Sequence, residues 1–271
     1  MASRNGLNPK IRSPKGVGHG RALPAPFGFG NGISPGGTGF LNIPFLERNV
    51  LFPDEITIEW WVDTSENYDS SYRCIFCVAD TVNSKFLNSD NYGIAVQGSA
   101  SGNIGYVFTG PYSVPLNTLV HVIFTHKMNS TPNSGNTNIY LNGLLSTSAS
   151  SLLSAPFNIN RFLIFANVAS LNTQNQYWLC KSDEIRIYNK VLSPTEASLN
   201  YNAGLGSNPA NTESLLAWYQ FEQFENLDFS FTQDGSDIGV GIRDMSGNNN
   251  HCKANGFDVD PLSSYYVLEP F

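Results

Sequence analysis

Two cysteines three positions apart are the most direct sign of chemistry in the sequence. Cys74 and Cys77 form a C-x-x-C pair, a spacing typical of zinc ligands and of redox centres. The run C-I-F-C-V predicts a β-strand, on which residues three apart face opposite sides. Neither Cys180 nor Cys252 belongs to a second pair of this kind. We therefore expect four buried free thiols rather than a zinc site.

The histidines and serines show no catalytic spacing. The four histidines are His19, His121, His126 and His251. None is paired at a spacing typical of metal ligands, so structural roles are expected for them. The run G-S-A-S-G at 98–102 has alanine where a serine hydrolase needs its nucleophile. These residue types predict a protein without a catalytic centre.

Carbohydrate binding needs exposed aromatic side chains on which sugar rings stack, together with polar groups that bind hydroxyls. Five tyrosines lie in segments without a strand or helix pattern. These candidate ligand-binding residues are Tyr68, Tyr72, Tyr92, Tyr112 and Tyr177. The alternative for each of them is an ordinary packing role in its loop.

Basic residues are concentrated at the N-terminus. The 271-residue chain has 15 Lys and Arg against 22 Asp and Glu, a net charge of −7. Residues 1–46 contain five of the basic residues and no acid, which leaves 10 minus 22, or −12, for the remainder. The five are Arg4, Lys10, Arg12, Lys15 and Arg21. Because prolines exclude a helix and glycines disfavour a strand, residues 1–26 are predicted to form an extended basic arm before an acidic body.

The arm is expected to dock on a partner chain or on its own body, because a Gly/Pro-rich segment does not order alone. Its five basic residues are then the anchoring residues; the alternative is a flexible terminus. Five charges without interleaved aromatic residues make a poor nucleic-acid footprint. The sequence has no run of 18 apolar residues and no apolar signal-peptide core, so neither a membrane span nor export by a signal peptide is expected.

Alternating hydrophobic residues predict that β-strands position these groups. The clearest strand covers residues 56–62, where the even positions are apolar and share one face. Similar patterns occupy residues 119–127, 138–146, 161–166, 182–188 and 215–221. Asn142-Gly143 between two apolar runs predicts a hairpin turn, because both turn residues need positive φ.

One short helix is predicted in this β-rich chain. Ser193 can cap its start, Pro194 suits the first helical position, and Glu196 completes a capping box. Residues 200–204 end in Asn-Ala-Gly and predict a stop. Many short strands with turns between them indicate an all-β sandwich.

Four motifs in a fixed order resemble the laminin G-like domains, which belong to the concanavalin A-like lectin/glucanase jelly rolls. They are T-I-E-W-W-V, L-V-H-V-I-F-T-H, N-I-Y-L-N-G-L-L and S-D-E-I-R-I-Y-N-K-V-L-S-P-T-E-A-S. The resemblance covers residues 27–204. It implies an antiparallel β-sandwich jelly roll with one short helix, preceded here by the extended N-terminal arm.

The C-terminal part resembles the opening segment of the same family. L-L-A-W-Y-Q-F and D-M-S-G-N-N-N-H match that segment, which comes last in this chain. Residues 205–271 are too few for a second sandwich. We expect them to complete the first one, either on their own chain as in a circular permutation or by strand exchange with a neighbouring copy.

The resemblance requires a test for hydrolase residues, because the fold family includes glucanases. Those enzymes use an E-x-D-x-x-E run, which is absent here. Asp54, Glu55 and Glu59 come nearest without matching it. Asp183 and Glu184 are adjacent, so on a regular strand they point to opposite faces. A glucanase-like hydrolase is therefore the less favoured alternative.

Some related domains hold a structural Ca²⁺ through aspartate and backbone oxygens. Asp183 occupies the D-E position of the family motif, and Asp244 begins an oxygen-rich D-x-S-G-N-N-N turn. The resemblance thus makes these two residues the candidate calcium ligands. For Asp244 an ordinary Asx-turn is the alternative.

A lectin-like sandwich with a basic arm and no catalytic constellation suggests a non-enzymatic structural and adhesion protein. The resemblance implies a virus particle, because modules of this kind occur in bacteriophage structural proteins. The chain would then be a capsid decoration, head fibre or tail-associated subunit, assembled in the host cytoplasm. Its expected partners are other virion proteins, copies of itself and a glycan, with no nucleic acid or membrane. A carbohydrate-binding module of a cellular protein is the main alternative.

Overall fold

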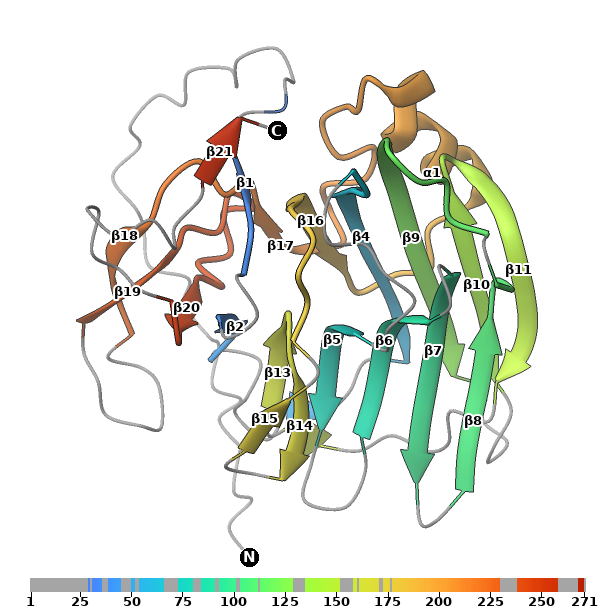
Figure 1. Cartoon of the computed structure of the whole chain (residues 1–271), viewed down its shortest axis with the longest axis horizontal. Helices are drawn as coiled ribbons and strands as arrows, with labels where there is room; N and C mark the ends of the chain where they lie inside the picture. The colour runs from blue at the N-terminus through green and yellow to red at the C-terminus, as the bar shows by residue number, and fades with distance from the viewer. Residues whose placement is uncertain are drawn as a thin grey trace, which may run out of the picture.

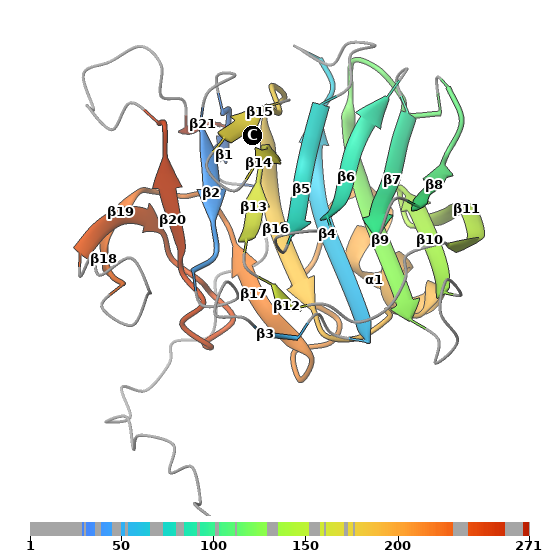
Figure 2. The ribbon, with the colours of Figure 1, turned by 90° about the horizontal axis from the view of Figure 1, so that it is seen from below.

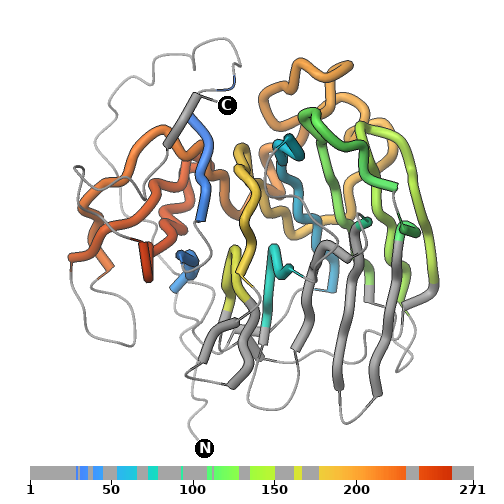
Figure 3. Tube along the Cα trace, in the orientation of Figure 1, coloured from blue at the N-terminus to red at the C-terminus, as the bar shows by residue number. Residues whose placement is uncertain are grey.

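The computed structural model describes the chain between Phe29 and Pro270 with gaps, and Figure 3 follows its trace. The described residues are 29, 31–35, 39–44, 50–51, 54–65, 73–79, 84–90, 93–100, 103–111, 113–128, 135–151, 158–159, 161–170, 173–175, 177–229, 238–257 and 268–270. The predicted arm, residues 1–26, lies outside them together with its five anchoring residues.

Two antiparallel sheets of eight and nine strands face each other (Figures 1 and 2). The first has the order β11 (Leu144–Ser151), β10 (Gly135–Leu141), β9 (Leu119–Met128), β4 (Glu55–Asp63), β16 (Ser182–Tyr188), β1 (Asn31–Ile33) and β21 (Leu268–Pro270), and β17 (Leu215–Tyr219) also pairs with β16. The second has the order β18 (Glu225–Asp228), β19 (Ile238–Ile242), β20 (Cys252–Asn255), β2 (Phe40–Asn42), β13 (Arg161–Ile164), β5 (Arg73–Ala79), β6 (Ser84–Asp90), β7 (Gly93–Ala100) and β8 (Asn103–Phe108).

Short elements complete the architecture. They are the ribbon of β3 (Val50–Leu51) with β12 (Asn158–Ile159), the ribbon of β14 (Asn167–Ser170) with β15 (Thr173–Asn175), the helix α1 (Pro194–Tyr201) and a 3₁₀ turn at Asn202–Gly204. The predicted all-β sandwich with one short helix is confirmed for the described residues. None of their helices is long and apolar enough to cross a membrane.

The main hydrophobic core lies between the two sheets. Ile58 and Trp60 of β4 pack there with Val122 of β9, and Phe76 and Phe162 contribute from the other sheet. The rings of Trp60 and Phe76 meet edge to face, with centroids 5.7 Å apart. The alternation predicted for residues 56–62 is therefore confirmed on this face.

The middle of the outer face of the eight-stranded sheet is buried as well. Glu59 and Trp61 point away from the core residues of β4, yet neither is more than 1% exposed. The helix α1 packs over this face, where Ala197 meets Ile123 and Tyr140. Because water does not reach this part of the face, the polar groups there must find partners inside the protein.

The predicted helix signals are confirmed. Ser193 Oγ accepts the Glu196 N–H at 3.2 Å, and Glu196 Oε2 accepts the Ser193 N–H at 2.8 Å, which completes the capping box. Asn202 adopts a left-handed conformation and ends α1. The predicted hairpin turn joins β10 to β11, with φ values of 50° and 74° at Asn142 and Gly143.

The segment 205–271 contributes strands to both sheets. β17 pairs with β16, β20 pairs with β2, and β21 pairs with β1. The orange-to-red strands β18 to β20 accordingly lie beside the blue β1 and β2 (Figure 1). The two ends of the described chain therefore meet in the same part of the sandwich.

All four cysteines are buried free thiols, as predicted. The expectation that Cys74 and Cys77 face opposite sides is wrong, because the register of β5 shifts between Cys74 and Phe76. This irregularity places both cysteines in one cluster with Leu163 and Phe40. Burial raises the pKa of the Cys74 thiol well above its usual value, and neighbouring Cys77 adds to the rise, so this thiol is protonated and unreactive at neutral pH.

Candidate functional site

An open hollow of about 690 Å³ lies beside the C-terminal end of α1. It is lined by Phe29, Leu119, Asn202, Gly204, Leu205, Gly206, Ser207 and Asn208. Leu205 is 71% exposed, and the polar side chains in the lining are two amides and one hydroxyl. The hollow therefore offers apolar surface and neutral hydrogen-bonding groups side by side.

The loop that forms the rim of the hollow, residues 202–208, is fixed by its own hydrogen bonds. Asn202 and Gly206 have positive φ values of 48° and 64°. The N–H of Leu205 donates to the Asn202 carbonyl and that of Gly206 to the Tyr201 carbonyl, both at 3.1 Å. Asn202 Nδ2 donates to the Gly206 carbonyl at 2.7 Å. These bonds give the rim a defined shape without a ligand.

A stack of aromatic rings supports the hollow from below. Phe29 meets Trp61 edge to face, with ring centroids 4.8 Å apart. Trp61 stacks on His121, with ring centroids 4.5 Å apart. The Tyr201 ring stacks on both, with its centroid 5.8 Å from that of Trp61 and 5.9 Å from that of His121. β4, β9 and α1 thus each contribute one ring beneath the residues that line the hollow.

The structure places the candidate ligand-binding tyrosines away from this hollow or outside the described residues. Those outside are Tyr68, Tyr72, Tyr92 and Tyr112. Tyr177 is half-buried, forms an isolated bridge with Cys74, and does not line the hollow. The rim loop was not among the predicted site residues. Its signal was the run Asn202-Ala203-Gly204, which we interpreted only as a helix stop.

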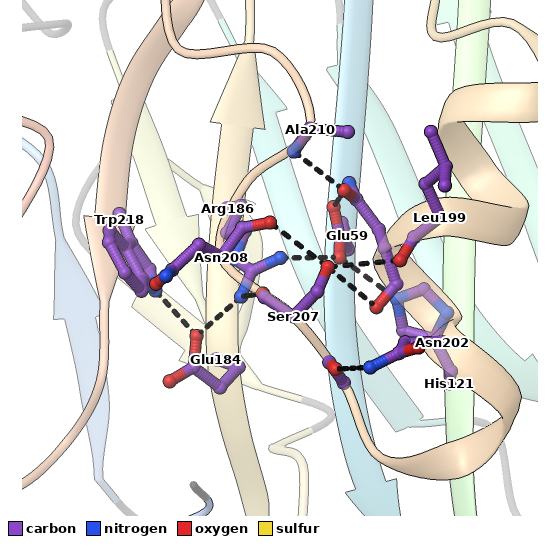
Figure 4. A network of polar contacts seen from close by, with 12 residues as sticks. Glu59, His121, Glu184, Arg186, Leu199, Asn202, Ser207, Asn208, Ala210 and Trp218 are labelled. Carbon is purple, nitrogen blue, oxygen red and sulfur yellow. Dashed lines mark hydrogen bonds and ion pairs between the residues drawn. The ribbon is translucent and has the colours of Figure 1, made fainter. Parts of the chain in front are cut away.

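A fully buried carboxylate, Glu59, lies beneath the rim loop (Figure 4). Its Oε1 accepts a hydrogen bond from Arg186 Nη1 at 3.0 Å, and His121 Nε2 lies 2.9 Å from the same oxygen. Its Oε2 accepts from the Tyr188 hydroxyl at 3.0 Å and from Asn200 Nδ2 at 2.7 Å. Burial by itself raises the pKa of Glu59, but Arg186 and these hydrogen bonds outweigh burial and hold the pKa below its usual value.

Arg186 connects Glu59 to a second buried acid and to the rim of the hollow (Figure 4). Its Nη2 donates to Glu184 Oε2 at 2.9 Å and to the Ser207 carbonyl at 2.6 Å. The Trp218 indole N–H donates to the same Glu184 oxygen at 2.5 Å, and the Trp218 ring lies 5.1 Å from the guanidinium. The charge network on the sheet therefore also holds the rim loop in place.

Glu184 reaches the network through an irregularity in β16. The pairing of β16 with β4 shifts register between Asp183 and Arg186, and the φ of Glu184 is 52°. The sequence pattern predicts a regular strand here, which the structure does not have. Burial raises the pKa of Glu184, although Arg186 and hydrogen bonds from Gln220 and Trp218 oppose the rise.

Glu59 and Glu184 are not arranged as a hydrolytic pair. A glycosidase needs carboxyls that flank a substrate bond, one of them as proton donor. Here both side chains are at most 1% exposed, and each bonds a different nitrogen of the Arg186 guanidinium. A polysaccharide cannot reach either carboxylate, so this acid pair serves the fold.

Both carboxylate oxygens of Asp244 accept hydrogen bonds at the turn that this residue begins. Its Oδ1 accepts the N–H groups of Trp218 and Ser246 at 2.9 and 2.8 Å. Its Oδ2 accepts the Ser246 hydroxyl at 2.7 Å and the Asn250 N–H at 2.9 Å. A carboxylate has about four acceptor positions, and these four bonds use them in the manner of the Asx-turn alternative.

Asp183 is buried with one oxygen unused. Its Oδ1 accepts the Glu184 N–H at 2.7 Å, whereas Oδ2 has no hydrogen-bond partner among the described residues. Within those residues no group of three His, Cys, Asp or Glu side chains is arranged to hold a metal ion. Calcium binding by Asp183 and Asp244 therefore stays a prediction.

Asp183→Asn is expected to stabilise the protein at neutral pH. Burial and the negative charges of Glu184 and Glu222 raise the pKa of Asp183 well above its usual value. Its ionised form therefore costs stability above about pH 4, the pKa of an unfolded aspartate, and costs nothing below it. One pKa unit corresponds to about 1.4 kcal/mol, so urea unfolding in EDTA should show a gain of at least about 1 kcal/mol at pH 7 that vanishes below pH 4. A gain that is the same at both pH values would contradict this account.

Comparisons with known proteins identify the fold family of the chain. Residues 35–198 match a family model described as the concanavalin A-like lectin/glucanases superfamily. A proposed carbohydrate-binding protein from Bacteroides ovatus ATCC 8483 is 17% identical with a TM-score of 0.56, and the alignment covers 85% of this chain and 59% of that protein. A SAP-like pentraxin from Limulus polyphemus is 11% identical with a TM-score of 0.48, covering 64% of this chain and 82% of the pentraxin.

The CBM40 of the Ruminococcus gnavus IT-sialidase is 14% identical with a TM-score of 0.45, covering 68% of this chain and 96% of that module. Among curated proteins the sequence has no significant match. At 17% identity and a TM-score of 0.56, the Bacteroides ovatus protein shares a fold with this chain. The matched family residues include all the strands from β2 to β16.

Proposed function

The chain belongs to the concanavalin A-like lectin/glucanases superfamily, and we propose from this membership that it is a non-catalytic carbohydrate-binding module. The superfamily name covers both lectins and hydrolases, so the choice between them depends on the site. The observation that carries the proposal is the hollow beside α1, which combines exposed Leu205 with the amides of Asn202 and Asn208. A sugar presents an apolar ring face and hydroxyl groups, and such a surface can bind both.

Two further observations support a binding module over a hydrolase. The described residues that line the hollow include no carboxyl group, whereas glycoside hydrolysis needs two. The buried acids Glu59 and Glu184 are held by Arg186 and cannot reach a substrate. The Bacteroides ovatus protein, which shares the fold, is itself a proposed carbohydrate-binding protein, and this suggests the ligand class.

The proposal is tested by binding measurements on variants of the rim. A glycan array identifies a ligand for the full chain, and calorimetry then measures its affinity for Leu205→Asp and Asn208→Ala. We expect each change to weaken binding at least tenfold, because the first places a charge against the sugar ring and the second removes hydrogen-bonding groups. Both side chains are exposed, so thermal unfolding should change little.

The matched control is Leu199→Asp. Leu199 is also an exposed leucine, 57% accessible on α1, but it does not line the hollow. Its replacement should leave the affinity unchanged. Glycan binding that survives both rim changes, or turnover of a polysaccharide by the wild-type chain, would refute the assignment.

We further propose that the module belongs to a structural and adhesion protein of a virus particle, as a capsid decoration, head fibre or tail-associated subunit. The support is the five-charge basic arm before a body with a formal charge of −12, a distribution suited to docking on an acidic assembly. Other virion proteins and further copies of the chain are the proposed partners. Deleting residues 1–26 should then abolish incorporation into particles, measured as copies per particle. Full occupancy by the truncated chain would contradict the anchoring role.

A further inference from the structure

We infer that the hollow selects uncharged saccharides, an inference that rests on the proposed carbohydrate-binding function. Acidic sugars carry a carboxylate or sulfate, and proteins bind such groups through Arg, Lys or converging N–H groups. Among the described residues that line the hollow none has an ionisable side chain: they are Phe, Leu, Gly, Asn and Ser. An acidic group would lose its hydration there without gaining a cationic partner.

The one cation bonded to the rim loop in the described structure is not available to a ligand. Arg186 is fully buried, and its nitrogens donate to Glu59, to Glu184 and to the Ser207 carbonyl. The two glutamates that bond the guanidinium compensate its positive charge. An anion in the hollow therefore gains no free cation from this network.

Two backbone donors of the rim are not available to an anion either. Successive N–H groups at left-handed residues can converge on an anion, and Gly206 has such a conformation. However, its N–H donates to the Tyr201 carbonyl and that of Leu205 to the Asn202 carbonyl. Both N–H groups already donate to carbonyls of the chain and are not available to a carboxylate.

The groups that remain match neutral hydroxyls. Asn208 is exposed, and its side-chain amide has no hydrogen-bond partner among the described residues. An amide both donates and accepts, as a hydroxyl does. Asn202 uses Nδ2 on the Gly206 carbonyl and keeps its Oδ1 as an acceptor. Leu205 beside them supplies the apolar surface for a ring face.

The test compares matched neutral and acidic probes on the full chain. The array carries neutral oligosaccharides together with their sialylated, sulfated and uronic-acid counterparts, such as lactose with 3′-sialyllactose. We expect neutral probes to bind at least tenfold more tightly than their acidic counterparts, with less than a twofold change in affinity between 50 and 500 mM NaCl. Leu205→Arg, which adds a cation at the rim, should shift the ratio toward the acidic probe at least tenfold.

The outcomes separate this inference from the proposed function. Tighter binding of acidic probes that Asn208→Ala abolishes would overturn the neutral selectivity and leave carbohydrate binding at the hollow intact. Binding of no probe of either kind would overturn both. An unchanged ratio in Leu205→Arg, with wild-type stability, would show that the rim does not set selectivity and would also overturn the inference.

Discussion

Arg186→Met is expected to destabilise the protein by about 3–5 kcal/mol, the typical cost of removing one partner from a buried ion pair. The change leaves Glu59 and Glu184 buried without a compensating charge, since both bond the same guanidinium. It also removes the donor to the Ser207 carbonyl, so the rim of the hollow should loosen. Urea unfolding at pH 7 measures the loss directly.

Three comparisons isolate the buried charge as the cause. Arg243 pairs with Glu225, but its side chain is 50% exposed, so Arg243→Met should cost at most about 1 kcal/mol. Adding Glu59→Gln and Glu184→Gln to Arg186→Met removes all three charges and should restore much of the stability. The penalty of Arg186→Met should also shrink as the pH falls toward about 4, because buried carboxyls without a compensating charge then take up protons. Equal losses for the two arginine variants would contradict the network.

Gly241→Ala is expected to cost about 3 kcal/mol, at the upper end of overpacking effects. A Cβ atom at Gly241 in β19 would lie 2.2 Å from the Cys252 carbonyl oxygen in β20 and 2.9 Å from the Phe229 ring. The first of these neighbours is backbone and cannot rotate away. The change should therefore separate β19 from β20 and weaken the C-terminal part of the nine-stranded sheet.

Gly239 provides a matched control on the same strand. The nearest atoms to a Cβ there are at 3.4 Å, in the side chains of Lys253 and Phe229, which is ordinary contact. Gly239→Ala should change the free energy of unfolding by less than about 1 kcal/mol. Similar unfolding midpoints for the two alanine variants would mean that β19 and β20 do not pair as described.

Local signals in the sequence predicted the elements that depend on local physics. The alternation at 56–62 and the Asn142-Gly143 turn follow from side-chain periodicity and from backbone sterics, and the structure confirms both. The capping box of Ser193 and Glu196 requires only four consecutive residues. Such features need no knowledge of the rest of the chain.

The site could not be predicted in this way, because it depends on irregular strands and distant contacts. The register shift in β16 brings Glu184 onto Arg186, and the shift in β5 brings Cys74 beside Cys77. No periodic pattern in the sequence predicts either shift. The rim loop becomes a site only because Arg186, a strand residue 21 positions earlier, bonds the Ser207 carbonyl. A sequence motif for that contact does not exist.

Chemical-shift mapping with the neutral saccharide that binds best is the most direct test of the hollow as the binding site. Backbone amide signals of residues 202–208 and Leu119 should shift with ligand concentration, while those of exposed Leu144 at the β10–β11 turn should not. Shifts confined to other loops, with the rim unaffected, would contradict the account.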